Sequence, residues 1–435
     1  MNAIDQTIVA TALDTLQKDL DAPISWVAWT ITIYALGMLL FVPVAGKLCE
    51  QHGHRRVFQG SIILFTLASL SCGLSNDIYT LVALRFVQAV GVAGFYPAAT
   101  GLIVTHLGSD RDRALGLFGS MFPIGAMIGP IFGGLFVTYW SWRGIFFVNV
   151  PIGIVLSLLT FYFVPVDIQQ KQKREPMDFK GMTQLGAGML CLMLAFNGLS
   201  GGGHQSTWLP DVVLPTVLGL IAFALFIRHS RVTAQPFIPG YLMGGPGFRN
   251  VNLINFGGGT VVGIISLIPL YAASRYGISA LGSGTILTVE GLIALPSSAL
   301  AVLTLRKTGY HSPIYAGLAT IGLGTVMLAV PPWGLHPYLW LAIAAALIGF
   351  GAGWLSPASR NAGFQLAPDR APTLAALRTM AMQIGAIVSI SITTAVIANA
   401  SNPGLAHAWA YVGWGGLLLV MMTLVAQVPE HHGAW

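Results

Sequence analysis

The chain has 435 residues, of which 55% are hydrophobic and only 8% are charged. Soluble proteins average about 25% charged residues, so this composition excludes an ordinary soluble domain and predicts a polytopic α-helical membrane protein. The net charge of +6 comes from basic residues gathered in particular loops, which indicates membrane topology and gives no support for nucleic-acid binding. The three cysteines, Cys49, Cys72 and Cys191, provide no disulfide framework and no metal-binding spacing.

The first apolar run, 1–16, ends at a polar stretch around Lys18 and is shorter than the roughly 20 residues that a span needs. We therefore expect a first helix that has lost its first turns. Asp5 would lie roughly 20 Å from Lys18 along this helix, inside the hydrocarbon layer, where an ionised and unpaired carboxylate is costly. Asp5 is a functional candidate for that reason; the alternative is an exposed residue at a frayed terminus.

The second run, 26–45, starts with two tryptophans that suit an interfacial anchor and is followed by a short basic loop. Gly53 permits a tight turn in this loop, and Glu50 is placed to pair with Arg55 or Arg56. The loop is either an ordinary positively charged cytoplasmic loop or a gate. The candidate gate residues are Gly46, Glu50, Gly53, Arg55 and Arg56.

The fourth run, 78–104, carries an arginine near its middle. Arg85 would lie about 13 Å from Asn76, at the start of the helix, and at a depth comparable to that of Asp5. A buried arginine has to find a carboxylate or carbonyl oxygens, and Asp5 is the nearest partner that the sequence offers.

The fifth run contains glycines in a regular pattern. Gly125, Gly129 and Gly133 recur every four residues and line one helix face, so another helix can approach closely. Pro130 and Gly134 complete the pattern Gly-x-x-x-Gly-Pro-x-x-Gly-Gly. Glycines alone would indicate only a packing face, whereas the ordered pattern is more specific.

A polar linker at 169–176 separates these runs from the rest of the chain, and two further spans follow at 182–199 and 212–227. Six more apolar runs bring the prediction to fourteen spans, counting the short first one: 251–271, 281–305, 313–330, 338–355, 374–398 and 408–428. Most lysines and arginines then lie on the side of the Arg55 loop, which predicts that both termini are cytoplasmic.

An internal repeat relates the two halves. Gly91 and Gly351, Pro97 and Pro357, and Gly125 and Gly385 are separated by the same number of residues. Parallel six-helix repeats are typical of transporters. The expected organisation is an N-terminal six-helix bundle at 1–165, a linker with two inserted spans at 166–247, and a C-terminal six-helix bundle at 248–435.

Polar residues are few within the spans of the second half. Glu290 is the only acid there, and it is either a neutral buried carboxyl, one facing water, or a site for cations or protons. Two asparagines and a glutamine could equally form interhelical hydrogen bonds. The candidate residues of a substrate cavity are Trp29, Gln88, Asn252, Asn255 and Gln383.

Three stretches together resemble a known family: the loop 46–56, the segment Arg85-Phe-Val-Gln-Ala-Val-Gly91, and the glycine pattern on the fifth span. They are similar to motifs of the 14-span drug:proton antiporters of the major facilitator superfamily. The resemblance implies two six-helix bundles plus two inserted spans, a cytoplasmic gate in the loop, an antiporter motif on the fifth span, and proton coupling by Asp5, Arg85 and Glu290. The sequence departs from the family at Asp14, which replaces a usual proline, and at Gln51 and His54, which replace basic residues and predict a weaker gate.

We therefore expect proton-coupled export of amphipathic, cationic, drug-like compounds across the cytoplasmic membrane by a monomeric, multi-pass protein. No zinc-protease motif, nucleophile elbow or phosphate-binding loop is found, so we expect no enzyme activity, metal or cofactor. The alternatives are an exporter of one defined metabolite or lipid, and a transport-inactive membrane sensor or scaffold.

Overall fold

The computed structural model describes residues 2–106, 111–165, 178–199, 208–233, 236–238, 247–366, 371–428 and 430. Within these ranges the protein is helical throughout and contains no strand. Twelve of the described helical segments are long and apolar enough to cross a membrane. The N-terminal helix and the fifth helix complete the predicted fourteen, which confirms the predicted fold class.

The first helix is built from α1 (Asn2–Ile8), a 3₁₀ stretch (Val9–Ala12) and α2 (Leu13–Asp19). The helices up to the linker follow it in order: α3 (Ile24–His52), α4 (His54–Leu74), α5 (Ile78–Ala93), α6 (Phe95–His106), α7 (Arg111–Tyr139), α8 (Gly144–Phe147) and α9 (Asn149–Phe163). α5 and α6 form one span with a break at Gly94. Several helices extend beyond their apolar runs, so the connecting loops are short.

The second part of the chain starts with a hairpin of α10 (Phe179–Leu199) and α11 (Leu214–Val232), the latter preceded by a π-helical turn (Leu209–Val213). The last helices are α13 (Phe248–Tyr276), α14 (Ala280–Thr308), α15 (His311–Ala329), α16 (Pro337–Gln365), α17 (Ala371–Ala398) and α18 (Pro403–Met421), with a closing 3₁₀ stretch (Met422–Gln427).

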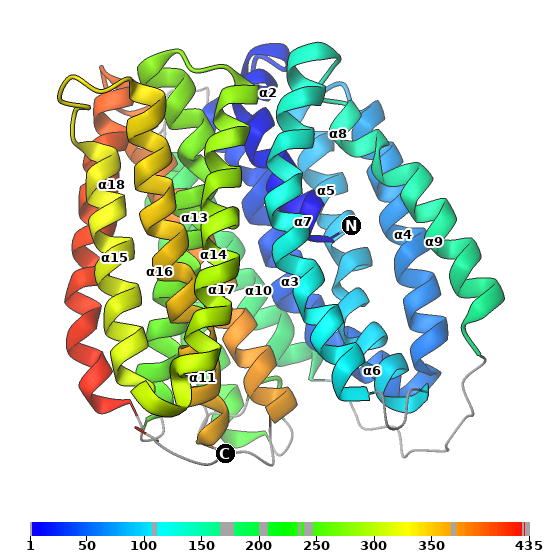
Figure 1. The fold of residues 1–435 in the computed structure, drawn as a ribbon. Helices are drawn as coiled ribbons and strands as arrows, with labels where there is room; N and C mark the ends of the chain where they lie inside the picture. The colour runs from blue at the N-terminus through cyan, green and yellow to red at the C-terminus, as the bar shows by residue number, and fades with distance from the viewer. Residues whose placement is uncertain are drawn as a thin grey trace.

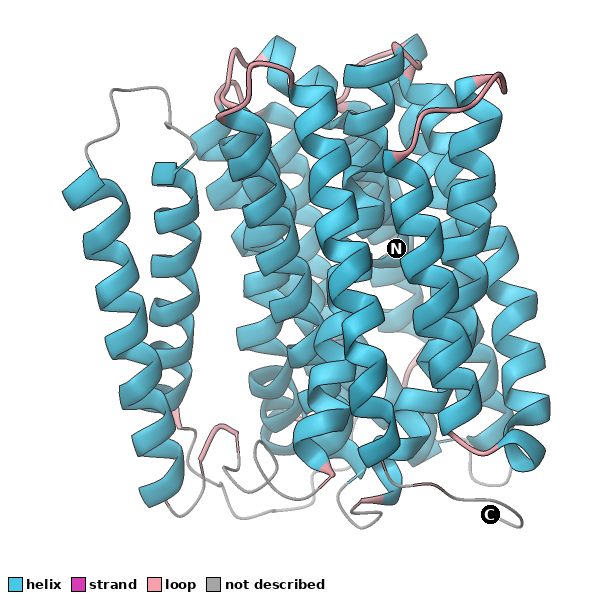
Figure 2. Ribbon diagram, turned by 90° about the vertical axis from the view of Figure 1, so that its left-hand side faces the viewer, coloured by secondary structure: helices cyan, strands magenta, loops and turns pink. Residues whose placement is uncertain are grey.

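The helices pack as two groups, which lie on opposite sides of Figure 1. In the first group α3 and α4 pack on α5, and α7 packs on α1; in the second, α16 packs on α14 and α15, and α13 packs on α17. The groups meet mainly through α7 with α14 and α3 with α17, and the first helix also contacts α13 and α14. The α10–α11 hairpin stands at the left of Figure 2, and α10 contacts both α3 and α17. The division into three domains stays a prediction.

One carboxylate ties the base of this hairpin together. Asp178 accepts hydrogen bonds from the backbone N–H groups of Gly181 (2.9 Å) and Phe237 (2.8 Å) and pairs with Nε2 of His229 (2.7 Å). Burial works against its charge, but the hydrogen bonds outweigh that cost and hold the pKa of Asp178 below its usual value. Asp178 thus connects the start of α10, the end of α11 and the segment that leads to α13.

We predict that Asp178→Asn lowers the Tm of the detergent-purified protein by a few degrees, because charge-assisted hydrogen bonds are lost. A depressed carboxyl pKa stabilises the fold above the unfolded-state value of about 4 and loses that effect as the pH falls through the folded-state pKa. Differential scanning fluorimetry should therefore show a gap between wild type and variant at neutral pH that closes in acid. Asp19→Asn, at an exposed site, is the control; an equal shift there would contradict the prediction.

Candidate functional site: a buried ion pair beside a glycine seam

The first helix lies inside the N-terminal group of helices, although it carries polar residues. Asp5 is fully buried, and α1 and the 3₁₀ stretch contact α7. Thr7 and Thr11 donate their hydroxyl protons to carbonyls of the same helix, at 3.0 Å to Ala3 and 2.7 Å to Ile8. Without these bonds the two hydroxyl groups would lie among apolar side chains with no hydrogen-bond partner. The helix can therefore present one charged residue, Asp5, to the interior.

Asp5 forms an ion pair with Arg85. Nη1 of Arg85 lies 2.7 Å from Oδ2 of Asp5, and the side chains are 1% and 0% exposed. Nε of Arg85 donates to the carbonyl oxygen of Thr30 on α3 at 3.0 Å. The sequence proposed these two residues as partners on depth alone, and the structure brings them into contact across 80 positions of sequence.

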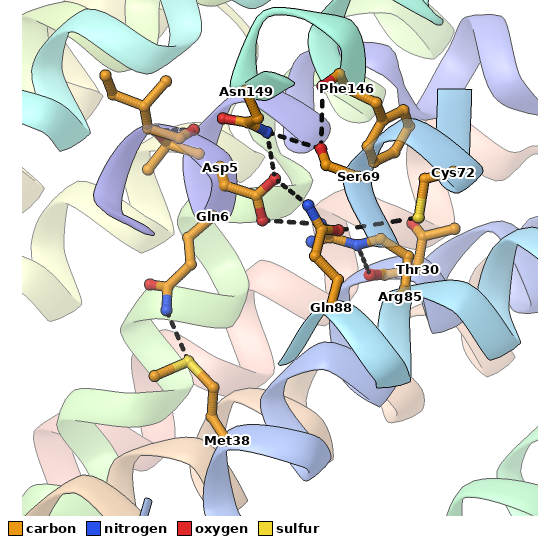
Figure 3. Close-up of polar contacts among 12 residues, drawn as sticks. Asp5, Gln6, Thr30, Met38, Ser69, Cys72, Arg85, Gln88, Phe146 and Asn149 are labelled. Carbon is orange, nitrogen blue, oxygen red and sulfur yellow. Dashed lines mark hydrogen bonds and ion pairs between the residues drawn. The ribbon is translucent and has the colours of Figure 1, made fainter. Parts of the chain in front are cut away.

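Two amides complete the set of groups around the carboxylate (Figure 3). Gln88 accepts from Arg85 Nη1 at 2.6 Å and donates to Asp5 Oδ1 at 3.1 Å. Asn149, at the start of α9, donates to the same oxygen at 3.1 Å and to Ser69 Oγ at 3.1 Å. Ser69 in turn donates to the carbonyl oxygen of Phe146. Four helices therefore depend on the charge of one carboxylate: the first helix, α5, α9 and, through Ser69, α4.

Aromatic rings cover the guanidinium of Arg85. Its Cζ lies 4.1 Å from the centre of the Tyr34 ring and 5.7 Å from that of Phe146. Such cation–π contacts replace part of the lost hydration of a buried arginine. A buried pair of this kind contributes little net stability when intact, but loss of either partner leaves an uncompensated charge, at a cost of about 3–5 kcal/mol.

The glycines of α7 form the seam against which the first helix packs. A Cβ atom at Gly125 would lie 2.8 Å from Cβ of Ala3, and one at Gly133 would lie 2.7 Å from the carbonyl oxygen of Ile8 and overlap Thr11 Oγ1. Gly129 faces Ile4 and Thr7 in the same way. Only a hydrogen fits at these positions, so the seam holds the helix that carries Asp5 at close range.

The same part of α7 also contacts the other group of helices. A Cβ at Gly134 would lie 2.7 Å from Cα of Leu281 on α14, and the carbonyl oxygen of Pro130 lies against Gly284. Thr288 on α14 donates to the carbonyl oxygen of Met127 at 3.3 Å. α7 thus lies between the first helix and α14. Gly125, Gly129 and Gly133 face the first helix, whereas Pro130 and Gly134 face α14.

The internal repeat is visible in this packing. α17 lies on α13 as α7 lies on the first helix, and Gly385, the counterpart of Gly125, faces Phe256 and Thr260 of α13. At the next position of the second half the glycine is on the partner helix: Gly263 of α13 faces Ser389, which stands where the first half has Gly129. The two seams are therefore equivalent in position and different in shape.

The proposed gate lies at the end of the molecule that we predict to be cytoplasmic. Gly53 has φ +91°, a conformation that favours glycine, and it allows α3 to end and α4 to begin without a loop. Arg55 donates to the carbonyl oxygen of Phe161, at the end of α9, at 2.6 Å, and Arg56 is exposed. Gly46 has open space around it. The side chain of Glu50 lies outside the described residues, so its expected pairing stays a prediction.

The residues proposed for a substrate cavity are spread over several helices. Gln88 belongs to the ion-pair cluster. Trp29 lines a small polar cavity with Ser25, Thr32, Asn197 and Ser391, where α10 meets α3 and α17. Nε2 of Gln383 on α17 lies 3.7 Å from Sδ of Met38, which Gln6 also approaches to 3.0 Å, so these three residues meet between the two groups of helices.

Three residues of the second half remain. Asn255 is 4% exposed and its Oδ1 has no hydrogen-bond donor among the described residues, whereas Asn252 is half-buried. Glu290 is half-buried on α14 where Gly349 of α16 touches its backbone. Within the described part of the chain its carboxylate has no hydrogen bond and no ion pair. Glu290 is therefore not part of the cluster around Asp5 and Arg85.

Sequence reasoning missed Asn149 and Tyr34 as members of the site. A lone asparagine between phenylalanines and valines in an apolar run is a signal that could have identified Asn149, since a buried amide needs polar partners. Tyr34 carries no such signal, because a tyrosine in a membrane helix is unremarkable and its position over Arg85 depends on how α3 and α5 cross.

Fourteen helices in two groups, with a charge pair buried inside one of them, define a multi-pass membrane protein of the transporter type. The family model described as Major Facilitator Superfamily matches residues 1–390, and the chain belongs to this superfamily. Solved structures with the same fold include a mutant peptide transporter POT in complex with sulfate, at a TM-score of 0.71 and 15% identity over 98% of this chain and 91% of that one.

Several curated relatives carry names that refer to multidrug transport or drug resistance. The chain is 30% identical to the multidrug transporter protein MdtP of Bacillus subtilis over 82% of its own length and 65% of that protein's, so it spans less than two thirds of this relative. It is 28% identical to the methylenomycin A resistance protein of Streptomyces coelicolor, over 100% of this chain and 91% of the relative. It is 26% identical to the putative multidrug resistance protein MdtD of Klebsiella pneumoniae, over 100% of this chain and 93% of that protein.

We predict that Gly133→Leu abolishes transport while the protein still inserts into the membrane, because the leucine separates the first helix from α7. Overpacking of this kind costs about 1–3 kcal/mol, which a protein that remains inserted can absorb. Export of a fluorescent drug and the yield of monodisperse purified protein are measured together. Gly60→Leu, on an open face of α4, is the matched control; normal export by Gly133→Leu would contradict the role of the seam.

Proposed function

We propose that this protein exports amphipathic, drug-like compounds, preferentially cationic ones, in exchange for protons across the cytoplasmic membrane. The observation that carries the proposal is the buried Asp5–Arg85 pair, a titratable acid held by a cation and two amides within the helices of a major facilitator transporter. The multidrug names of several relatives support a drug-like substrate.

Protonation of Asp5 is the event that we propose to drive the exchange. A neutral carboxyl group releases the ion pair, and Arg85 then depends on Gln88, the Thr30 carbonyl and the aromatic rings alone. The first helix carries this change to α7 through the glycine seam, and α7 contacts α14 of the other group. A proton at Asp5 thereby biases the packing between the two groups, which is the requirement for alternating access.

The substrate would bind between the two groups of helices, near the contact of Gln6 and Gln383 with Met38. Methionine side chains adapt to ligands of different shape, which suits a promiscuous site. Glu290 supplies a half-buried carboxylate without a partner among the described residues, which an organic cation would neutralise. We further propose cytoplasmic termini, a monomeric state, and the three-domain division given above.

Export of one defined metabolite or lipid is the second candidate within transporters, and a transport-inactive sensor or scaffold is the candidate from a different class. A promiscuous exporter responds to several unrelated drugs, a dedicated exporter responds to one compound, and a sensor moves neither drug nor proton. Drug-induced proton release from the purified protein, tested with a panel of compounds, separates the three.

We predict that Asp5→Asn eliminates proton release and proton-driven export for all substrates, because asparagine keeps a similar shape but cannot exchange a proton. Drug-induced acidification is recorded with the purified protein in weakly buffered solution, and export is recorded in vesicles with an imposed pH gradient. Asp14→Asn, a half-buried acid on the same helix that pairs with the exposed Lys18, is the matched control. Normal proton release by Asp5→Asn would reject the assignment.

We predict that Glu290→Gln weakens the binding of cationic substrates about tenfold and leaves neutral ones nearly unchanged, because only a cation gains from the unpaired carboxylate. The measurement is the Kd of a cationic dye and of a neutral analogue for protein in lipid nanodiscs. A similar loss for both ligands would indicate a structural role of Glu290.

A further inference from the structure

An arginine at the predicted cytoplasmic end of α17 has an incomplete set of partners. Nη2 of Arg378 donates to Oγ of Ser356 on α16 at 2.9 Å. Its Nε is buried and has no acceptor among the described residues. A guanidinium presents five donors in a fixed plane, and a buried donor without an acceptor is costly. The site is therefore built to receive an acceptor that the described side chains do not supply.

The charges around Arg378 indicate what this acceptor is. Arg360 of α16 and Tyr96 of α6 are near enough to interact electrostatically with Arg378. Arg360 is a like charge and is exposed, and Tyr96 is 63% exposed and belongs to the other group of helices. Two cations and no described acid favour an anion, and the position of Tyr96 places the site at the junction of the two groups.

One face of α16 connects this site to Glu290. Gly349, Gly353, Ser356 and Arg360 recur at helical spacing and lie on the same face. Gly349 touches the backbone of Glu290, Gly353 touches Ala294, and Ser356 bonds Arg378. Gly349 and Ser356 are seven residues apart, so the acid and the arginine lie about 10 Å apart along the helix axis.

We propose that Arg378, Arg360 and Ser356 form an anion subsite that binds the carboxylate of amphoteric substrates, whose cationic end faces Glu290. The inference rests on the proposed export function and specifies its substrate class: amphiphiles that carry an ammonium and a carboxylate at opposite ends. A planar carboxylate can accept from Nε and a terminal nitrogen of Arg378 in parallel, which a single point charge cannot do as well.

The test uses three quinolones of nearly the same shape. Norfloxacin carries a carboxylate and a piperazinium, its methyl ester keeps only the cation, and N-acetylnorfloxacin keeps only the carboxylate. Binding is measured by the fluorescence anisotropy of the quinolone ring with protein in nanodiscs at neutral pH and without a proton gradient. Wild type should bind norfloxacin most tightly, because only norfloxacin satisfies both charges.

Arg378→Gln should weaken norfloxacin and N-acetylnorfloxacin about tenfold and leave the methyl ester within about twofold, the loss expected for one charge-assisted hydrogen bond. Glu290→Gln should give the complementary pattern, with norfloxacin and the methyl ester weakened. Arg231→Gln, an exposed arginine on α11, is the control and should change nothing. If Arg378→Gln does not fold, Arg360→Gln at an exposed position provides the same comparison with the same expected selectivity.

The inference is overturned if the ester binds wild type as tightly as norfloxacin, if the Arg378 and Arg360 variants weaken all three ligands alike, or if wild type does not bind norfloxacin. Because no proton gradient is used, the result does not depend on coupling. Normal proton release by Asp5→Asn, with the quinolone pattern intact, would reject the proposed proton coupling at Asp5 and keep the subsite.

Discussion

The ion pair between Asp5 and Arg85 is the interaction on which the rest of the N-terminal helices depend. Five helices meet at it, the first helix, α3, α4, α5 and α9, and each supplies a polar group that depends directly or through Ser69 on the carboxylate or the guanidinium. A core of this size could be filled with apolar side chains at no loss of stability. Because it holds a charge instead, loss of the pair would alter the hydrogen-bond partners of every helix around it.

The geometry also explains why the first helix is held by glycines. A side chain at Gly129 or Gly133 would move the helix away from α7 and change the distance from Asp5 to Arg85. Because α7 contacts α14 with the neighbouring residues, a displacement of α7 would also change its contact with the second group. The second half keeps the packing, with Gly263 on α13 and Gly385 on α17, but its acid, Glu290, lies on α14, outside the contact of α13 with α17.

The sequence allowed the helices, their number and the partnership of Asp5 with Arg85 to be predicted, because each follows from apolar length or from the cost of an unpaired charge. The glycine face was predicted from spacing, but not the helix that covers it. Asn149 and Tyr34 could not be placed, since their roles depend on helix crossings. The Arg378 site was missed for a related reason: near the end of an apolar run an arginine looks like an ordinary topology signal, and only the structure shows its buried Nε.

The position of the α10–α11 hairpin has a consequence for how a compound dissolved in the lipid reaches the protein. The two groups of helices meet along α3 with α17 and along α7 with α14, and each junction is a potential side entrance from the bilayer. α10 packs across the first junction and contacts both of its helices. A compound that enters from the bilayer along α3 and α17 would therefore have to pass α10.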